Sequence, residues 1–148
     1  MRRIEKIALV PYTAQQMYQL VNDVEHYSAF IPWCASSHVE NHTESEMQAT
    51  LVLEHSGVKQ SFTTKNTLFP FEKIKMTLEK GPFKHLNGEW RFEPRSEGGC
   101  QVCLQLDFEF SSGLMGMLFG PFFEKAANKL VDSFCQRANE VYGVKNLL

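Results

Sequence analysis

The sequence predicts an α+β protein in which a curved antiparallel sheet of seven strands wraps around a long C-terminal helix. Three observations carry this prediction. Apolar and polar residues alternate between residues 36 and 110, turn-forming residues interrupt the alternation five times, and an apolar stripe with helical spacing follows it. Because strands with one apolar face need a covering layer, the amphipathic helix after the strands is the natural cover.

Composition places the chain among ordinary globular proteins. Its 148 residues are 43% hydrophobic and 22% charged, and this length fits one domain over residues 1–148. The net charge is -2, so the chain as a whole does not attract nucleic acid and we expect no DNA partner. The start, MRRIEKIALVPY, lacks the apolar stretch of a signal peptide, and no apolar run is long enough to span a membrane. We therefore expect a cytoplasmic protein.

The N-terminal region predicts one strand and then a helix. A strand over residues 3–10 is followed by Thr13 and Gln16, which have the spacing of a capping box at a helix start. Tyr12 and Met17 are placed to pack across this cap as a hydrophobic staple. The apolar residues that follow keep helical spacing, so the first helix begins here.

The stretch DVEHYSAFIPWC, residues 23–34, concentrates aromatic side chains in a short connector. We expect a second short helix to carry Tyr27, Phe30 and Ile31. Pro32 then forces the chain into extended geometry, and Trp33 follows it directly. This segment links the first helix to the sheet.

The last two strands indicate most clearly which face of the sheet is dry. In the first of them the apolar face carries Leu86, Gly88, Trp90 and Phe92. In the second it carries Cys100, Val102, Leu104, Leu106, Phe108 and Phe110. Mostly polar residues fill the positions between, so one face meets water and the other meets the core.

The closing helix is expected to begin at Pro121, because a proline at the first helical position loses no hydrogen bond. Its apolar stripe consists of Phe122, Ala126, Leu130, Phe134, Ala138 and Val141. Gly143 is placed to cap the C-terminus. The helix then has about 22 residues and a length of roughly 33 Å.

Few residues have the spacing of a catalytic or metal site. The CQVC stretch resembles half of a redox or zinc motif, but a separation of three in a strand puts Cys100 and Cys103 on opposite faces. His38 and His42 have no further candidate ligands beside them. The common motifs of hydrolases, metalloenzymes and nucleotide-binding proteins do not occur. We therefore expect no metal, no cofactor and no catalysis.

The fourth strand carries polar residues on the face expected to be inward. That face consists of Val58, Gln60, Phe62, Thr64, Asn66 and Leu68. A buried amide or hydroxyl without a partner costs about 1–3 kcal/mol, so Thr64 and Asn66 are candidate contacts for the polar end of an apolar ligand. Met76, Trp90 and Phe108 are candidate walls of the same cavity. The alternative is that the opposite face of this strand is the buried one.

The stretch GLMGMLFGPFF, residues 113–123, allows two interpretations. As part of the core it needs no function. As a flap over the mouth of a cavity, its glycines would allow movement, while Met115, Phe119 and Phe122 would contact a ligand or enter a lipid interface.

A family resemblance extends over nearly the whole chain. It rests on the stretches VPYTAQQMYQLVNDVEHYSAFIPWC, KNTLFPFEKIKM, GPFKHLNGEWRFEP and LDFEFSSGLMGMLFGPFFEKAANKLVDSFCQRANEVYG. They resemble the coenzyme Q-binding, polyketide-cyclase-like branch of the START (SRPBCC) superfamily, which includes bacterial ribosome-association toxins. Ser28 departs from the proline that is often found at this place in the family.

The resemblance implies a helix-grip fold with a hydrophobic tunnel between the sheet and the C-terminal helix. The tunnel would bind a lipid such as a polyprenyl quinone without chemical turnover, and the aromatic connector would form part of its rim. The candidate ligand-binding residues are Phe30, Trp33, Phe62, Thr64, Asn66, Met76, Trp90, Leu106, Phe108, Met115, Phe119, Phe122 and Ala126.

Two functions follow from the resemblance. The first is a carrier or chaperone of a ubiquinone-like lipid that supports respiratory electron transport and transiently contacts the inner face of a membrane. The second is a regulator that binds the large ribosomal subunit and blocks subunit association. The second requires a basic surface, and the sequence offers only three small clusters: Arg2 with Arg3, Lys73 with Lys75, and Lys125 with Lys129. We therefore rank the lipid function first.

Overall fold

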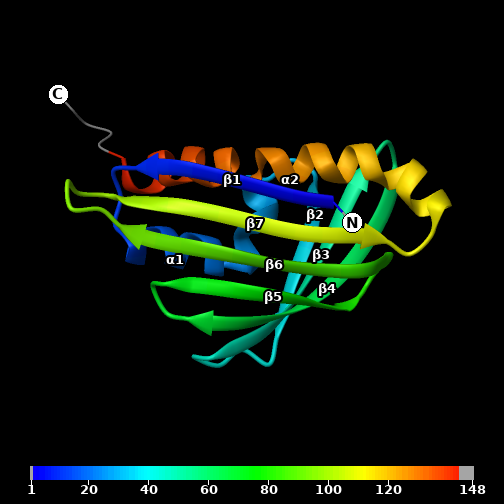
Figure 1. Ribbon diagram of the computed structural model, residues 1–148, viewed down its shortest axis with the longest axis horizontal. Coiled ribbons are helices and arrows are strands. Elements are labelled where there is room, and N and C mark those ends of the chain that lie inside the picture. The colour runs from blue at the N-terminus through cyan, green and yellow to red at the C-terminus, as the bar shows by residue number, and fades with distance from the viewer. Residues whose placement is uncertain (1, 144–148) are drawn as a thin grey trace.

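A computed structural model describes residues 2–143 and has the predicted layout (Figure 1). One sheet contains seven strands in the order β1-β7-β6-β5-β4-β3-β2, and each neighbouring pair is antiparallel. The strands are β1 (Arg2–Val10), β2 (Cys34–Glu40), β3 (Glu46–His55), β4 (Val58–Phe69), β5 (Lys73–Lys80), β6 (Phe83–Pro94) and β7 (Cys100–Phe110). The predicted α+β class and antiparallel meander are confirmed.

Three helical segments complete the fold. They are α1 (Ala14–Asn22), the 3-10 helix η1 (Val24–Ala29) and α2 (Gly113–Tyr142). The capping box of α1 is confirmed, because the Thr13 hydroxyl accepts from the Gln16 amide at 3.0 Å and the Gln16 side chain accepts from the Thr13 amide at 2.9 Å. The second predicted helix is also present as η1, but it ends at Ala29, so it carries Tyr27 while Phe30 and Ile31 follow it.

The start of α2 differs from the prediction. The helix begins at Gly113 and has 30 residues, so Pro121 lies inside it. Ser112 supplies the N-cap, since its hydroxyl accepts from the Met115 amide at 3.1 Å. Pro121 removes one backbone hydrogen bond within a long helix without ending it. Gly143 follows the last turn with a φ of -67°, so the left-handed cap expected there does not form.

The curvature of the sheet coincides with irregularities in strand pairing. Register shifts occur between Cys34 and Ser36, between Thr63 and Thr64, and between Phe83 and His85. Such bulges bend a strand and increase its twist. Figure 1 shows α2 running alongside β1, with the strands curving away beneath it. The concave side of the sheet therefore faces α2.

The apolar core lies between this concave side and the helices. The predicted dry face of β6 and β7 is confirmed, since Leu86, Trp90 and Leu104 are nearly fully buried. On β4 the predicted inward face is buried from Thr64 onward. Val58 is an exception with 54% of its surface exposed, because it begins the strand directly after the β3–β4 turn.

Candidate ligand cavity and surface groove

A small internal cavity of about 90 Å³ lies between the sheet and α2. Its lining is Val24, Tyr27, Trp33, Ala49, Leu51, Leu53, Phe62, Thr64, Asn66, Met76, Leu86, Trp90, Leu104, Leu106, Phe123, Ala126, Ala127 and Leu130. Almost all of these side chains are apolar. The cavity therefore favours an apolar occupant with few polar groups.

The polar groups of the cavity come from β4. Thr64 and Asn66 are 5% and 6% exposed, and the Thr64 hydroxyl donates to the side-chain oxygen of Asn66 at 2.7 Å. That bond occupies the amide oxygen, and within residues 2–143 the amide nitrogen of Asn66 donates to no protein group. The side chain of Asn66 thus offers a donor to a ligand that carries an acceptor such as a carbonyl oxygen.

Eight of the predicted ligand-binding residues meet at this cavity. They are Trp33, Phe62, Thr64, Asn66, Met76, Trp90, Leu106 and Ala126. The alternation on β4, β6 and β7 had placed most of them on one face. Their contact with a ligand stays a prediction.

Five predicted site residues lie outside the cavity lining. Phe30 packs against Phe134 with ring centroids 5.5 Å apart, because η1 turns it towards the far half of α2. Phe108 is 2% exposed and packs against Phe123 on the side of a neighbouring groove. Phe122 stacks on the ring of His55 with centroids 4.4 Å apart.

The remaining two outliers, Met115 and Phe119, belong to the first turns of α2, before that helix reaches the cavity. Phe119 is 8% exposed and lies near Phe122, with ring centroids 6.0 Å apart. The sequence prediction began this helix at Pro121 and allowed residues 113–123 to be a flap over the cavity. In the structure these residues instead start a continuous helix, and its first turns do not line the cavity.

Sequence reasoning missed other lining residues. Ala49, Leu51 and Leu53 alternate along β3, and Phe123, Ala127 and Leu130 follow helical spacing on α2. Both periods were visible in the sequence. The segment before β4 was not assigned an inward face, so its apolar alternation was not used.

The volume of the cavity limits what it holds. Sites for drug-sized ligands have volumes of about 300–1,000 Å³, and this cavity measures about 90 Å³. A quinone ring would therefore have to displace part of the lining. Binding of such a ligand requires the walls to move, for instance by a shift of α2 away from the sheet.

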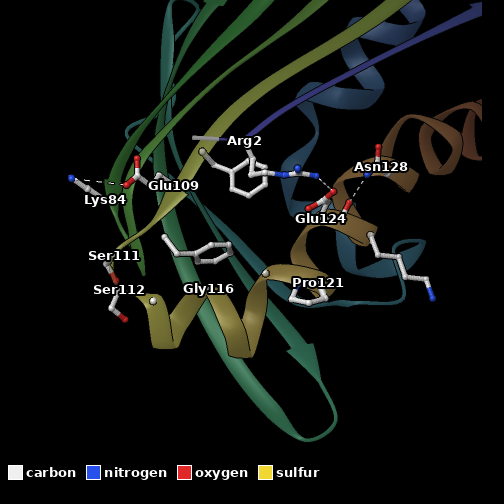
Figure 2. Close-up of a pocket in the computed structure, with 14 residues that line it drawn as sticks. Arg2, Lys84, Glu109, Ser111, Ser112, Gly116, Pro121, Glu124 and Asn128 are labelled. Atoms are coloured by element: carbon white, nitrogen blue, oxygen red, sulfur yellow. Dashed lines mark hydrogen bonds and ion pairs between the residues drawn. The ribbon is translucent and has the colours of Figure 1, made fainter.

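A larger and more open groove of about 1020 Å³ lies beside the start of α2. Figure 2 shows its two flanking ion pairs, Arg2 with Glu124 on one side and Lys84 with Glu109 on the other. Gly116 and Gly120 face Phe110, which lies 3.9 Å from the position that a β-carbon would take on either glycine. The groove is thus a mixed polar and aromatic surface.

Burial and hydrogen bonding shift several pKa values in the molecule. Burial raises the pKa of the Tyr27 hydroxyl, which donates to the carbonyl oxygen of Val21. Burial also raises the pKa of the Cys100 thiol to about 11. At the surface, hydrogen bonds from Arg3 lower the pKa of Asp107. These shifts maintain neutral groups in the core and an ion pair on the sheet edge, and none creates a general base in the cavity.

Within residues 2–143, histidine, cysteine and acidic side chains form no group of three that is suited to a metal ion. Across the same residues, no helix combines the length and apolar character needed to cross a membrane.

Comparison with known proteins identifies the family. Residues 10–135 match the family model described as polyketide cyclase / dehydrase and lipid transport. The chain belongs to this family, and its seven-stranded sheet and long C-terminal helix have the predicted helix-grip fold.

Within the family, the chain is similar to proteins with two kinds of name. It is 44% identical to the ribosome association toxin RatA of Pseudomonas aeruginosa, over 95% of this chain and 97% of that protein. It is 29% identical to the mitochondrial coenzyme Q-binding protein COQ10 homolog B of Xenopus laevis, over 96% of this chain and 61% of that protein.

Among solved structures, the Zhui aromatase/cyclase of a Streptomyces species superposes with a TM-score of 0.80 over 94% of both chains. Its sequence identity of 19% shows a shared fold only.

Proposed function

We propose that this protein is a ribosome-association regulator that binds the large ribosomal subunit and obstructs the joining of subunits in the cytoplasm. The observation that carries the proposal is 44% identity to a ribosome association toxin over nearly the full length of both chains. We therefore reverse the expected order of the two functions, because the relatives of this name from Pseudomonas aeruginosa and Escherichia coli, at 44% and 43% identity, are more similar to the chain than the coenzyme Q-binding relative at 29%.

The dimensions of the cavity support the same order. A cavity of about 90 Å³ holds about three waters' share of liquid volume, and a quinone needs several times more. Association with a ribosome requires no such space. The proposed activity is non-catalytic, since it consists of occupying a surface on one subunit.

Sedimentation tests this function. Purified protein is mixed with separated large and small subunits under conditions that favour joining, and the mixture is run on a sucrose gradient. We expect the protein to travel with the large subunit while joined ribosomes decrease in proportion to the protein added. Heat-unfolded protein is the control. A protein that remains at the top of the gradient while subunits join normally would contradict the proposal.

A second candidate function is binding of an apolar ligand, for which polyprenyl quinones are the proposed class. The observation that favours it is the apolar cavity with the unpaired amide nitrogen of Asn66. The quinone ring oxygens would accept from this nitrogen, provided that the walls open. The ligand would be bound without turnover, as cargo that the protein carries or protects.

Replacing Asn66 by Leu tests the ligand site. We expect weaker quinone binding in a fluorescence titration with little change in the fold, because the ligand loses a donor. Asn87→Leu is the matched control, since Asn87 lies on the wet face of β6 and bonds His85 at 2.8 Å. Equal affinity of the two variants would remove Asn66 from the site. Mass spectrometry of an organic extract of the purified protein identifies any lipid that it carries.

Loading such a ligand would involve transient contact with a membrane surface. Leu114, Met117 and Leu118 project from the first turns of α2 with 63–78% of their surface exposed. Lys125 and Lys129 continue the exposed side of the same helix. Apolar groups followed by lysines are suited to a surface of anionic lipids.

A further inference from the structure

Thr64 and Asn66 form a polar pair on the wall of the internal cavity. They are two residues apart on β4, so their side chains lie on the same face of the sheet, and both line the cavity. The Thr64 hydroxyl donates to the side-chain oxygen of Asn66 at 2.7 Å, and the two residues are only 5% and 6% exposed. This bond determines which hydrogen-bonding positions of the pair are left for a ligand.

The pair leaves one kind of donor and one acceptor open. Within residues 2–143 the amide nitrogen of Asn66 donates to no group, and the Thr64 oxygen, whose proton is already engaged, accepts from none. A hydroxyl oxygen accepts as well as donates, and an amide nitrogen only donates. A ligand that satisfies both groups therefore has to accept from Asn66 and donate to Thr64. Because the two side chains are bonded directly to each other, a single ligand atom can reach both.

We propose that this pair recognises a phenolic hydroxyl, so that the cavity prefers the reduced, hydroquinone form of a quinone to the oxidised form. One hydroxyl accepts from the Asn66 nitrogen and donates to the Thr64 oxygen. The inference rests on the proposed binding of an apolar ligand and adds the chemical group by which the ligand is selected.

A quinone carbonyl leaves one group of the pair unsatisfied. The carbonyl accepts from Asn66 but has no proton for Thr64, so two acceptor oxygens face each other. If the Thr64 hydroxyl turned towards the carbonyl instead, the buried oxygen of Asn66 would lose its donor. An unpaired buried polar group of this kind lowers affinity about tenfold.

The rest of the lining favours an uncharged aromatic ligand. Trp33, Phe62 and Trp90 contribute aromatic surface to the cavity, against which a flat ring packs by stacking or edge-to-face contacts. None of the lining residues carries a charge. An ionised carboxylate or amine would therefore lose its hydration without gaining a partner.

A single ring is close to the size of the cavity. An apolar cavity of about 150 Å³ is known to bind benzene, and this cavity measures about 90 Å³. Met76 lines it with a flexible side chain, whose methyl carbon lies 2.7 Å from the position that a β-carbon on Gly88 would take. Movement of this methyl group would supply the additional room for a ring.

Two small isomers test the selection of a hydroxyl directly. p-Cresol carries a phenolic hydroxyl, whereas anisole carries an ether oxygen that only accepts. We expect p-cresol to bind about tenfold more tightly, because only p-cresol pairs with both Thr64 and Asn66. The measurement is a titration followed by the nuclear magnetic resonance shifts of backbone amides, with p-xylene as the ligand without a polar group. Anisole binding as tightly as p-cresol would overturn the proposal.

Variants of Thr64 assign the selectivity to the pair. Thr64→Val removes the oxygen and keeps the shape, so the ratio of the two affinities should fall to about twofold or less, because each ligand then makes one hydrogen bond. Thr64→Ser keeps the hydroxyl and should retain the ratio. Thr67→Val is the matched control, since Thr67 lies on the exposed face of the same strand. An unchanged ratio in Thr64→Val would overturn the role of the pair.

The lipid itself is tested with the oxidised and reduced forms of a ubiquinone that has a short isoprenoid tail, with oxygen excluded. The reduced form should bind about tenfold more tightly, which raises the reduction potential of the bound couple by about 30 mV. Equal affinity of the two forms would overturn the preference while the proposed lipid binding stands. If p-cresol is preferred but neither form of the quinone binds, the recognition of a phenolic hydroxyl stands and the proposed lipid binding fails. No binding of any of these ligands would overturn both.

Discussion

The first part of α2, residues 113–122, and its longer second part, residues 123–142, are both rich in apolar residues but have different surroundings. Between residues 123 and 142, the buried positions are Phe123, Ala126, Ala127, Val131, Phe134 and Ala138. Between residues 113 and 122 only Phe119 is buried, and three large apolar side chains are exposed. The second part lies against the sheet and the N-terminal helices, while the first part extends past the core. Apolar content alone therefore does not show which part of a helix stabilises the fold.

The largest expected difference between the two parts of α2 is in how much their packing contributes to the free energy of unfolding. Phe134 is 1% exposed and lies between Tyr27 and Trp90, with centroid distances of 5.2 and 5.3 Å. Phe134→Ala should lower the free energy of unfolding by about 3–5 kcal/mol. Met117→Ala, at 78% exposure, should change it by less than about 0.5 kcal/mol. Urea unfolding of both variants checks the contrast. Similar losses of unfolding free energy would mean that the first part of α2 also packs in the core.

The second prediction uses pH to test whether water is excluded from the core that lies against the second part of α2. Burial and the nearby Cys135 of α2 raise the pKa of Cys100 from 9.0 to about 11. The unfolded chain therefore releases this proton at a lower pH than the folded chain, and stability falls as the pH rises from 9.0 to about 11. The loss attributable to Cys100 is roughly 2 kcal/mol.

Cys100→Ala provides the comparison for this decline. Thermal unfolding between pH 8 and pH 11 should show a shallower decline for the variant than for the parent, whatever the offset at neutral pH. Identical slopes would indicate that water reaches the thiol of Cys100 and that this part of the core is less dry than its burial implies.

Alanine substitutions at two glycines in the first part of α2 should change the free energy of unfolding by a smaller amount and in the opposite direction. A β-carbon added at Gly116 or Gly120 would lie 3.9 Å from Phe110, which is ordinary contact. Gly116→Ala and Gly120→Ala should each raise the free energy of unfolding by about 0.5–1 kcal/mol, because alanine restricts the unfolded chain and favours a helix. Gly88→Ala is the contrasting variant. Its β-carbon would lie 2.7 Å from Met76 at the cavity, so it should destabilise. Destabilisation by Gly120→Ala would show that the groove face needs the smaller residue.

Most of the fold was predictable because it follows from periodicity. Alternation on β6 and β7 and the capping box at Thr13 are local signals, and each gave the right element. The start of α2 was predicted wrongly at Pro121, because only the preference of proline for the first helical position was used, whereas the structure has Ser112 as the N-cap. A proline is tolerated inside a helix this long, since the flanking turns hold their own hydrogen bonds.

The candidate site was predictable only where a strand alternates. Thr64, Asn66 and Trp90 reach the cavity because their strands place every second side chain there. Phe30 and Phe122 were misplaced because their positions depend on how η1 and α2 pack, which spacing along the chain does not determine. The cavity volume is likewise a property of packing. The sequence supplied the chemistry of the cavity, while its small size emerged only from the structure.

The smallest effect on stability, and the sharpest test of function, is expected from the exposed apolar residues of α2. Met117→Ser with Leu118→Ser should change the free energy of unfolding by less than about 0.5 kcal/mol, because both side chains already face solvent. If these residues contact lipid, burying about 100 Å² of them contributes roughly 2.5 kcal/mol, which is enough for transient docking. The parent should then associate with vesicles of phosphatidylcholine, a lipid without net charge, with little dependence on salt, and the variant should lose that association.

Ribosome binding should respond in the opposite way, because it depends on phosphate contacts and not on these apolar groups. Flotation with vesicles and sedimentation with large subunits, each at low and high salt, separate the two. Salt-sensitive ribosome binding that survives the double substitution, together with no vesicle association by the parent, would eliminate the membrane contact and the lipid-loading function that depends on it. Loss of ribosome binding in the variant would instead show that the exposed apolar residues in the first part of α2 contact the ribosome. The contrast in burial between the two parts of α2 would then hold only for the isolated protein.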